Sequence, residues 1–523
     1  MSVKILPSTL PQISADDLLG HITTLASDRF EGRSPGTVGE ELTLAYLTGL
    51  CGELGLAPAG DHGTYLQSMP VTGLSMQAAA KFACAAKKQN VELLASEQIV
   101  LRSQWWQEQI DVDSDVVFVG YGIVAPEYDW DDYKGVDVRG KTVVMLIGDP
   151  DAKDGDDKFF KGPALTYYGR WTYKFEIASE KGAAAVLIVH DTKKAGYGWD
   201  VVQASWGQEN FSVAQDVKRV RIEGWLCEAA ADKIFGLGGH DYGRLRQAAQ
   251  HADFSAVDLG VSAKLSVTNK LRTFKSSNVV AKWTGSDPLL SKECVVVCAH
   301  WDHFGKIERN GKIEILSGAL DNGSGVAVAL EIASALTKMK DRPRRSVIFL
   351  LTTLEERELL GARHYVQNPA MPLMDTVAVI NFDIMNPWGR TRNLISVARG
   401  HSSLDEVIEK LAATQGRTMG DDQEPDKGYF FRSDHLEFIR RGVPALFFLN
   451  PGDQFIDQPD DYALTKRVEY LTHCYHKAAD KVNPQWDLSG MAEDAQLLLA
   501  TTVEVANNDK RPTWKADSEF ARN

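Results

Sequence analysis

Short, continuously apolar segments alternate with helical segments over the last half of this chain, from about residue 275 to the end. The apolar segments span residues 293–299, 346–354, 376–382, 393–397 and 444–449. Helical patterns cover residues 326–336, 359–366, 404–413, 434–441 and 488–503. Continuous apolar strands that alternate with helices are typical of a parallel sheet covered on both faces. The sequence therefore predicts an α/β fold with a mostly parallel central sheet flanked by helices.

The stretch between residues 110 and 262 has a different pattern. Its short apolar strands are separated by turns rich in Gly and Asp, which is typical of a compact β-rich module. Before it, residues 14–70 show apolar side chains at a spacing of four, which predicts helices. We therefore expect an amino-terminal part at 1–109, an insert at 110–262 and the main part of the α/β domain at 263–523.

The composition excludes several classes of protein. With 523 residues, 44% of them hydrophobic, the chain can bury a large core. A net charge of −14 argues against a general nucleic-acid binder, and no apolar run reaches the roughly 18 residues of a membrane span. The first residues lack the apolar stretch of a secretory signal, so we expect either a cytoplasmic protein or a chain that begins after a removed leader. Cys294 and Cys298 are expected to be buried packing thiols.

Acidic and imidazole side chains follow the ends of the predicted strands. His300 and Asp302 follow the first strand, and Glu355 with Glu356 follows the second. Asp383 ends the third strand, and Asp321 precedes the helix after the first. The carboxyl ends of parallel strands meet at one edge of the sheet, where ligand sites lie. So much buried negative charge is costly without a cation.

This set of donors indicates the kind of metal. Mixed imidazole and carboxylate ligands suit zinc, with Co²⁺ or Mn²⁺ as substitutes. One His with three carboxylates exceeds the needs of a single tetrahedral zinc and indicates two ions that share a bridging carboxylate. A second His is then needed, and the residues alone leave four downstream candidates open: His401, His435, His473 and His476.

Five ordered motifs resemble the co-catalytic di-zinc aminopeptidase family, whose relatives include bacterial leucyl aminopeptidase, glutamate carboxypeptidase, transferrin receptor and glutaminyl cyclase. These motifs are VVVCAHWDHFG, SGALDNGSGVA, TLEERELLGARHYV, NFDIMNP and CYHKAADKVNPQWDLSG. The segment YYGRWTYKFEIASEKGAAAVLIVH resembles the protease-associated domain inserted in many members. The amino-terminal LASDRFEGRSPGTVGEE resembles the opening helix region of the family.

The resemblance implies roles for individual residues. It implies five metal ligands, with Asp321 as the bridge between the ions: His300, Asp321, Glu356, Asp383 and His476. It also implies that Glu355 is the general base, that Asp302 orients the ring of His300, and that Tyr475 donates a hydrogen bond to the oxyanion. His435 is the rival last ligand, His303 is expected to be a supporting or structural residue, and Arg432 is a candidate contact for the end of the substrate.

The expected reaction is hydrolysis of the amino-terminal peptide bond of peptides through a water that bridges two Zn²⁺ ions. A carboxypeptidase or another amide hydrolase on the same scaffold stays open, because several arginines could bind a terminal carboxylate: Arg390, Arg392, Arg432, Arg440 and Arg441. A non-catalytic, receptor-like binding protein is the third reading. The resemblance suggests a periplasmic or secreted protein if a leader was removed. The preferred residue and the oligomeric state are not indicated by the sequence.

Overall fold

The structure is a computed structural model that describes residues 7–77, 80–87, 89–151, 159–213, 219–309, 311–449, 452–516 and 518–522. The chain divides into two compact units. Unit 1 comprises Met1–Met69, Lys275–Gln423 and Arg432–Asn523, and unit 2 comprises Pro70–Phe274 and Glu424–Phe431. Each unit has its own buried apolar core.

The central sheet of unit 1 is mostly parallel. Its strand order is β21–β18–β14–β17–β13, and every pair except β17–β13 is parallel. The bounds are β14 (Cys294–His300), β17 (Ser346–Thr352), β18 (Thr376–Asp383), β21 (Ala445–Leu449) and β13 (Val257–Trp283), with β1 (Ala57–Pro58) paired to β13. All residues of β14, β17 and β18 are buried, because helices cover both faces. The expected α/β fold is therefore confirmed.

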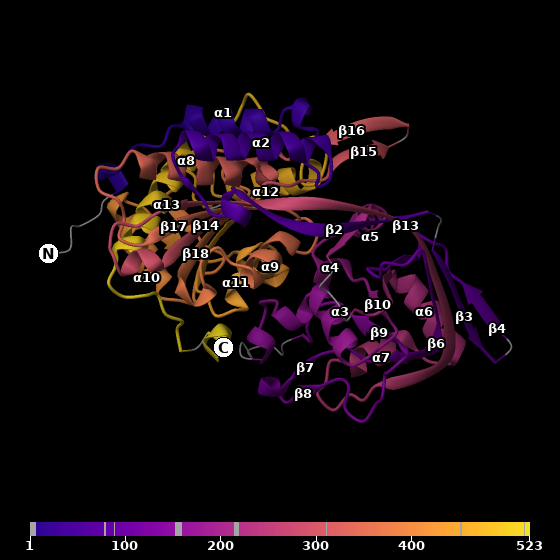
Figure 1. Ribbon diagram of the computed structural model, residues 1–523. Helices are drawn as coiled ribbons and strands as arrows, with labels where there is room; N and C mark the ends of the chain where they lie inside the picture. Colours follow the sequence, from indigo (N-terminus) through magenta and orange to yellow (C-terminus); the bar gives the residue numbers. More distant parts are fainter. Residues whose placement is uncertain are drawn as a thin grey trace. The chain divides into compact units, whose positions relative to one another are not determined.

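Figure 1 shows α1, α2 and α8 on one side of these strands and α9 with α11 on the other. The bounds are α1 (Ala15–Leu25), α2 (Val38–Glu53), α8 (Gly325–Thr337), α9 (Leu360–Gln367), α10 (Leu404–Thr414), α11 (His435–Ile439), α12 (Tyr462–His473) and α13 (Ser489–Asn507). Ser14 caps α1 by accepting hydrogen bonds from the backbone N–H groups of Asp16 and Asp17. Twelve of the thirteen residues of α8 are buried, which explains its apolar sequence.

Two predicted elements differ from the structure. The helical pattern expected over residues 14–70 ends at Glu53, and β1 and β2 (Leu66–Met76) follow it. The segment at 393–397 is expected to join the central sheet, but among the described residues β19 (Asn393–Ile395) pairs with β20 (Thr418–Gly420) in a separate two-stranded ladder. At three residues, β19 is short, and β21 occupies the place beside β18.

Unit 2 is built on a mixed sheet with the order β4–β3–β13–β6–β9–β10–β12–β5. Its strands are β3 (Lys81–Ala86), β4 (Gln89–Glu92), β5 (Ile99–Arg102), β6 (Gln109–Phe118), β9 (Thr142–Leu146), β10 (Ala185–Val189), β11 (Asn210–Val213) and β12 (Ile222–Leu226). Its helices are α3 (Trp171–Glu180), α4 (Thr192–Ala195), α5 (Trp199–Trp206), α6 (Glu228–Gly238) and α7 (Tyr242–Ala248). The unit starts at residue 70, not at the expected 110, because β3 pairs with β13 and β5 pairs with β12.

A distant segment also belongs to unit 2. The backbone N–H of Leu165 donates to the carbonyl of Pro425 at 3.0 Å, and the rings of Tyr167 and Phe431 lie 5.7 Å apart. That a protease-associated domain lies within this unit stays a prediction. Among the helices of the described residues, none has both the length and the apolar character needed to cross a bilayer.

Candidate metal centre

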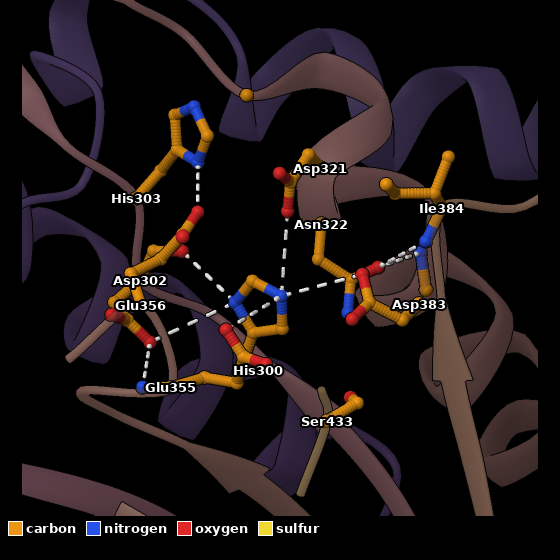
Figure 2. A network of polar contacts seen from close by, with 12 residues as sticks. His300, Asp302, His303, Asp321, Asn322, Glu355, Glu356, Asp383, Ile384 and Ser433 are labelled. Atoms are coloured by element: carbon orange, nitrogen blue, oxygen red, sulfur yellow. Dashed lines mark hydrogen bonds and ion pairs between the residues drawn. The ribbon is translucent and has the colours of Figure 1, made fainter. Parts of the chain in front are cut away.

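The carboxyl ends of the parallel strands bring the expected side chains to one edge of the unit 1 sheet. His300 is the last residue of β14, Asp383 is the last residue of β18, and Glu355 follows β17 by three residues. Asp321 lies in the helical turn η8 (Ala319–Ser324) that leads into α8. These four residues are all buried, and Figure 2 shows their side chains converging around the His300 ring.

The first group of donors surrounds Nε2 of His300. This atom lies 3.4 Å from Oδ1 of Asp321, 3.5 Å from Oδ1 of Asp383 and 3.8 Å from Oε2 of Glu355. His300, Asp321 and Asp383 form one of the groups that could hold a metal ion within the described residues.

The second group surrounds Nε2 of His476, which follows α12. This atom lies 3.2 Å from Oδ2 of Asp321 and 3.3 Å from Oε2 of Glu356. The two oxygens of the Asp321 carboxylate therefore face two different histidines, one in each group. This is the arrangement that a bridging carboxylate requires.

A third histidine contacts the second group. Nδ1 of His303 lies 2.7 Å from Oε1 of Glu356, and His303, Asp321 and Glu356 also form a group that could hold a metal ion. His303 is thus hydrogen-bonded to Glu356, which fits the supporting role expected from the sequence.

The electrostatics of the groups favour positive charge at their centre. Burial lowers the pKa of His476, but Glu356 and Asp321 outweigh it and raise this pKa to about 10. Burial likewise acts against protonation of His300, yet Glu355 and Asp383 raise the pKa of His300 well above its usual value. Burial would raise the pKa of Asp321, but its close contacts with His300 and His476 lower it well below its usual value.

The donors fit zinc in geometry and in chemistry. Two ligands about 2.0–2.1 Å from a tetrahedral zinc lie about 3.3 Å apart, close to the 3.2–3.5 Å between each histidine nitrogen and its carboxylate oxygens. Among the described residues, Nε2 of His300, Nε2 of His476 and Oδ1 of Asp383 are buried atoms without a well-formed hydrogen bond. One divalent cation at the first group would satisfy the atoms of His300 and Asp383, and a second cation at the other group would satisfy that of His476.

Asp302 supports this edge through two contacts. Its main-chain carbonyl lies 3.1 Å from Nδ1 of His300, whereas its carboxylate lies 3.7 Å from the same nitrogen, beyond hydrogen-bonding distance. The carboxylate accepts a hydrogen bond from the backbone N–H of Glu355 at 3.1 Å. Burial raises the pKa of Glu355 well above its usual value and that of Asp302 to about 7.

Tyr475 stacks on His476, with ring centroids 3.8 Å apart and an interplanar angle of 25°. The Phe304 ring packs against the same imidazole, with ring centroids 4.5 Å apart. These rings hold the orientation of His476. Burial, together with the negative charges of Asp321 and Glu356, raises the pKa of Tyr475 well above its usual value.

Sequence reasoning missed the role of Asp480. Its carboxylate accepts hydrogen bonds from the backbone N–H groups of Leu320 and Asp321 at 3.0 and 3.1 Å, and from the Tyr470 hydroxyl at 3.2 Å. Asp480 thus fixes the backbone of Asp321. Its only signal in the sequence was a place four residues after His476 in a motif.

The rival histidines have other surroundings. The His435 ring stacks on Phe447 at 4.2 Å, and His401 pairs with Ser518 at 3.1 Å. Within the described part of the chain, neither residue belongs to the two sets of three side chains that could hold a metal, and His476 is outside these two sets as well. His476 nevertheless contacts Asp321 and Glu356, at 3.2 and 3.3 Å. His473 ends α12 as an exposed residue.

Comparisons with known proteins find similarity to peptidases. Residues 278–500 match the sequence profile of Peptidase family M28, so the resemblance to the co-catalytic zinc aminopeptidase family is confirmed over this segment. The chain is 26% identical over 223 residues to leupeptin-inactivating enzyme 1 of Streptomyces exfoliatus, covering 41% of this chain and 46% of that protein. It is 29% identical over 249 residues to an aminopeptidase of Pseudomonas aeruginosa, covering 46% of this chain and 43% of that protein.

The chain thus spans less than half the length of these two curated relatives. Among solved structures, the aminopeptidase from Aneurinibacillus sp. strain AM-1 has a similar fold, with a TM-score of 0.53 and 16% sequence identity. The similarity covers 96% of this chain and 95% of that one.

Proposed function

Since residues 278–500 match the sequence profile of peptidase family M28, we propose that this chain is a di-zinc aminopeptidase that removes amino-terminal residues from peptides. The observation that carries the proposal is the Asp321 carboxylate, whose two oxygens lie 3.4 and 3.2 Å from Nε2 of His300 and of His476. Relatives named as aminopeptidases and as a probable zinc metalloprotease support the activity and the metal.

His300 and Asp383 would hold one zinc, His476 and Glu356 the other, and Asp321 both. When bound, the two ions supply the positive charge that acidifies a water and polarises a peptide carbonyl. His303 and Asp480 keep Glu356 and Asp321 in place through the contacts described above.

Glu355 is the general base in this mechanism. Its carboxylate lies at the first group, 3.8 Å from Nε2 of His300, and its backbone is fixed by Asp302. It accepts the proton of the attacking water and delivers that proton to the leaving amine. The Tyr475 hydroxyl donates a hydrogen bond to the oxygen that gains negative charge.

The second candidate is a carboxypeptidase on the same scaffold. One observation favours it: the positive charge of Arg432 acts to lower the pKa of Tyr475, so the Arg432 guanidinium lies near the proposed site. Two other arginines that could bind a terminal carboxylate form ion pairs within the protein: Arg390 with Glu493 at 2.9 Å and Arg440 with Glu437 at 3.7 Å.

A panel of aminoacyl p-nitroanilides, their N-acetylated forms and N-blocked dipeptides with a free carboxyl terminus tests the proposal. We expect hydrolysis of the free aminoacyl amides only, loss of activity with a chelator, and recovery after addition of Zn²⁺. Cleavage confined to the N-blocked dipeptides would support the carboxypeptidase, and zinc-free protein without any activity would support the receptor-like reading.

A further inference from the structure

Arg33 is a fully buried arginine from the amino-terminal motif EGRSPG, which the proposed mechanism does not use. Its side chain is 0% exposed. Three consecutive residues, Glu31, Gly32 and Arg33, have φ angles of 49°, 69° and 53°. Residues other than glycine adopt this left-handed region only where the surroundings enforce it, so the turn that directs Arg33 inward is strongly specified.

Within the part of the chain that the structure describes, the guanidinium of Arg33 donates to four backbone carbonyl oxygens. Nε donates to Trp301 at 2.8 Å, Nη1 to Leu25 at 2.9 Å and to Ser317 at 2.6 Å, and Nη2 to Gly318 at 2.8 Å. The planar fork of arginine can reach these separate acceptors at fixed angles, whereas the single ammonium of lysine cannot.

Three of these four acceptors lie in two of the segments that carry the proposed metal ligands, and the fourth, Leu25, ends α1. Trp301 is between His300 and Asp302, while Ser317 and Gly318 lead into the turn that holds Asp321. One side chain therefore ties the end of β14 to the backbone of the bridging carboxylate.

The backbone of the same turn contacts a third segment. The carbonyl of Gly32 accepts a hydrogen bond from the N–H of Gly305 at 3.0 Å. A Cβ at position 32 would lie 2.2 Å from the carbonyl oxygen of Leu316, so no larger residue fits there. The turn is thus packed directly against the strands of the hairpin β15 (Gly305–Arg309) and β16 (Lys312–Leu316).

Arg33 also brings positive charge to the carboxylates. Burial lowers its pKa to about 10, while Asp480, Asp321, Asp302 and Glu356 act in the opposite direction. The side chain therefore keeps its charge at neutral pH beside these acidic residues.

We propose that Arg33 is a positioning residue of the metal centre: its guanidinium holds the Asp321 turn against the end of β14 and offsets part of the negative charge, which sets the affinity of the site for divalent cations. This inference rests on the proposed function, because it assumes that the cluster binds metal.

The test compares Arg33→Lys and Arg33→Gln with Arg345→Gln in the full-length protein. Arg345 is a matched control, since it is 1% exposed in the same unit and binds Glu293 and the carbonyl of Val505. The readouts are Zn²⁺ affinity by competition with a chromogenic chelator, the visible absorption spectrum of the Co²⁺ form, and the melting temperature of the metal-free protein.

We expect Arg33→Gln to bind Zn²⁺ about 10- to 100-fold more weakly, the range typical for residues that support metal ligands. Arg33→Lys keeps the charge but loses the fork, so its affinity should recover in part while its Co²⁺ spectrum still differs from wild type. Arg345→Gln should lower the melting temperature and leave both metal readouts unchanged. If Arg33→Gln does not fold, Arg33→Lys carries the same comparison.

Wild-type affinity and a wild-type Co²⁺ spectrum in folded Arg33 variants would overturn the inference. An equal loss of affinity in Arg345→Gln would also overturn it, because the effect would then be general destabilisation. A wild-type protein that binds two zinc ions but hydrolyses none of the aminoacyl amides would refute the proposed function and leave the Arg33 comparison valid.

Discussion

The carboxylate of Asp302 accepts a hydrogen bond from the backbone N–H of Glu355 at 3.1 Å. The end of β14 is thereby joined to the residue that we propose as the general base, which follows the neighbouring parallel strand β17. Asp302 is 0% exposed, so this contact fixes the backbone of Glu355 in a place without competing solvent.

Substitution of Asp302 should therefore affect catalysis and metal binding together. In Asp302→Ala the N–H of Glu355 loses its acceptor, and we expect a 10- to 100-fold lower kcat, about the range known for residues that orient metal ligands. Asp302→Asn keeps an oxygen acceptor and should lose less. Steady-state kinetics with measured zinc content check both variants, and equal losses in the two would contradict a role for this hydrogen bond.

Substitution of Glu355 by glutamine should abolish turnover and spare the metal. The amide cannot accept a proton, and general acid–base catalysis contributes about 10²- to 10⁴-fold. Glu358→Gln in the same turn is the matched control and should retain activity. The account predicts normal zinc content in Glu355→Gln, and a variant that keeps its activity would exclude Glu355 as the base.

Tyr475→Phe should lower kcat with little change in KM. The phenyl ring preserves the stack on His476 at 3.8 Å but removes the hydroxyl donor, and the loss of one oxyanion donor costs about 10²- to 10³-fold in kcat. Tyr462→Phe, on α12 and packed on Phe455 at 5.1 Å, is the control. A kcat equal to that of wild type in Tyr475→Phe would show that the hydroxyl does not act in the reaction.

Lys174 makes the stability of unit 2 depend on pH. This lysine is buried and donates to the carbonyls of Tyr121 and Gly148 at 2.6 and 3.1 Å. Burial lowers its pKa to about 7, with Asp149 and Asp132 acting in the opposite direction. Above pH 7 the folded state has released a proton that the unfolded state keeps up to about pH 10.4, so this lysine makes the free energy of unfolding rise with pH across that window.

Hydrogen–deuterium exchange of α3 and β10 between pH 7 and 9.5, corrected for intrinsic rates, checks this prediction. Lys174→Met should remove the gain in protection with rising pH, while Lys193→Met, at an exposed position of α4, should retain it. The same pH profile in wild type and Lys174→Met would exclude Lys174 as its cause.

The sequence predicts the core of unit 1 well because two physical patterns are local. An unbroken apolar run such as 293–299 predicts a strand that is buried on both faces. Parallel strands place their carboxyl ends at one edge of the sheet, which brings His300 and Asp383 together. His476 has no such local pattern, since it follows the partly exposed helix α12. The residues alone leave four downstream histidines open, and only the motif around Tyr475 distinguishes His476 from the others.

Other features leave no periodic signal at all. Arg33 and Asp480 act on backbone N–H and carbonyl groups of segments about 160 to 285 positions away, and such contacts impose no pattern on the residues that receive them. The addition of Glu424–Phe431 to unit 2 is equally non-local. The apolar run at β19 predicts a strand, but such a run does not identify the partner of that strand. The sequence therefore does not reveal that β19 pairs with β20.

The zinc content of purified wild-type protein and of Asp321→Asn tests the central claim most directly. Oxygens of the Asp321 carboxylate lie 3.4 and 3.2 Å from the two histidines, so one substitution should weaken both ions. We predict close to two zinc ions per wild-type chain by elemental analysis and fewer than one in folded Asp321→Asn. Wild-type protein that binds no zinc, or an Asp321→Asn variant that retains two ions, would contradict the account.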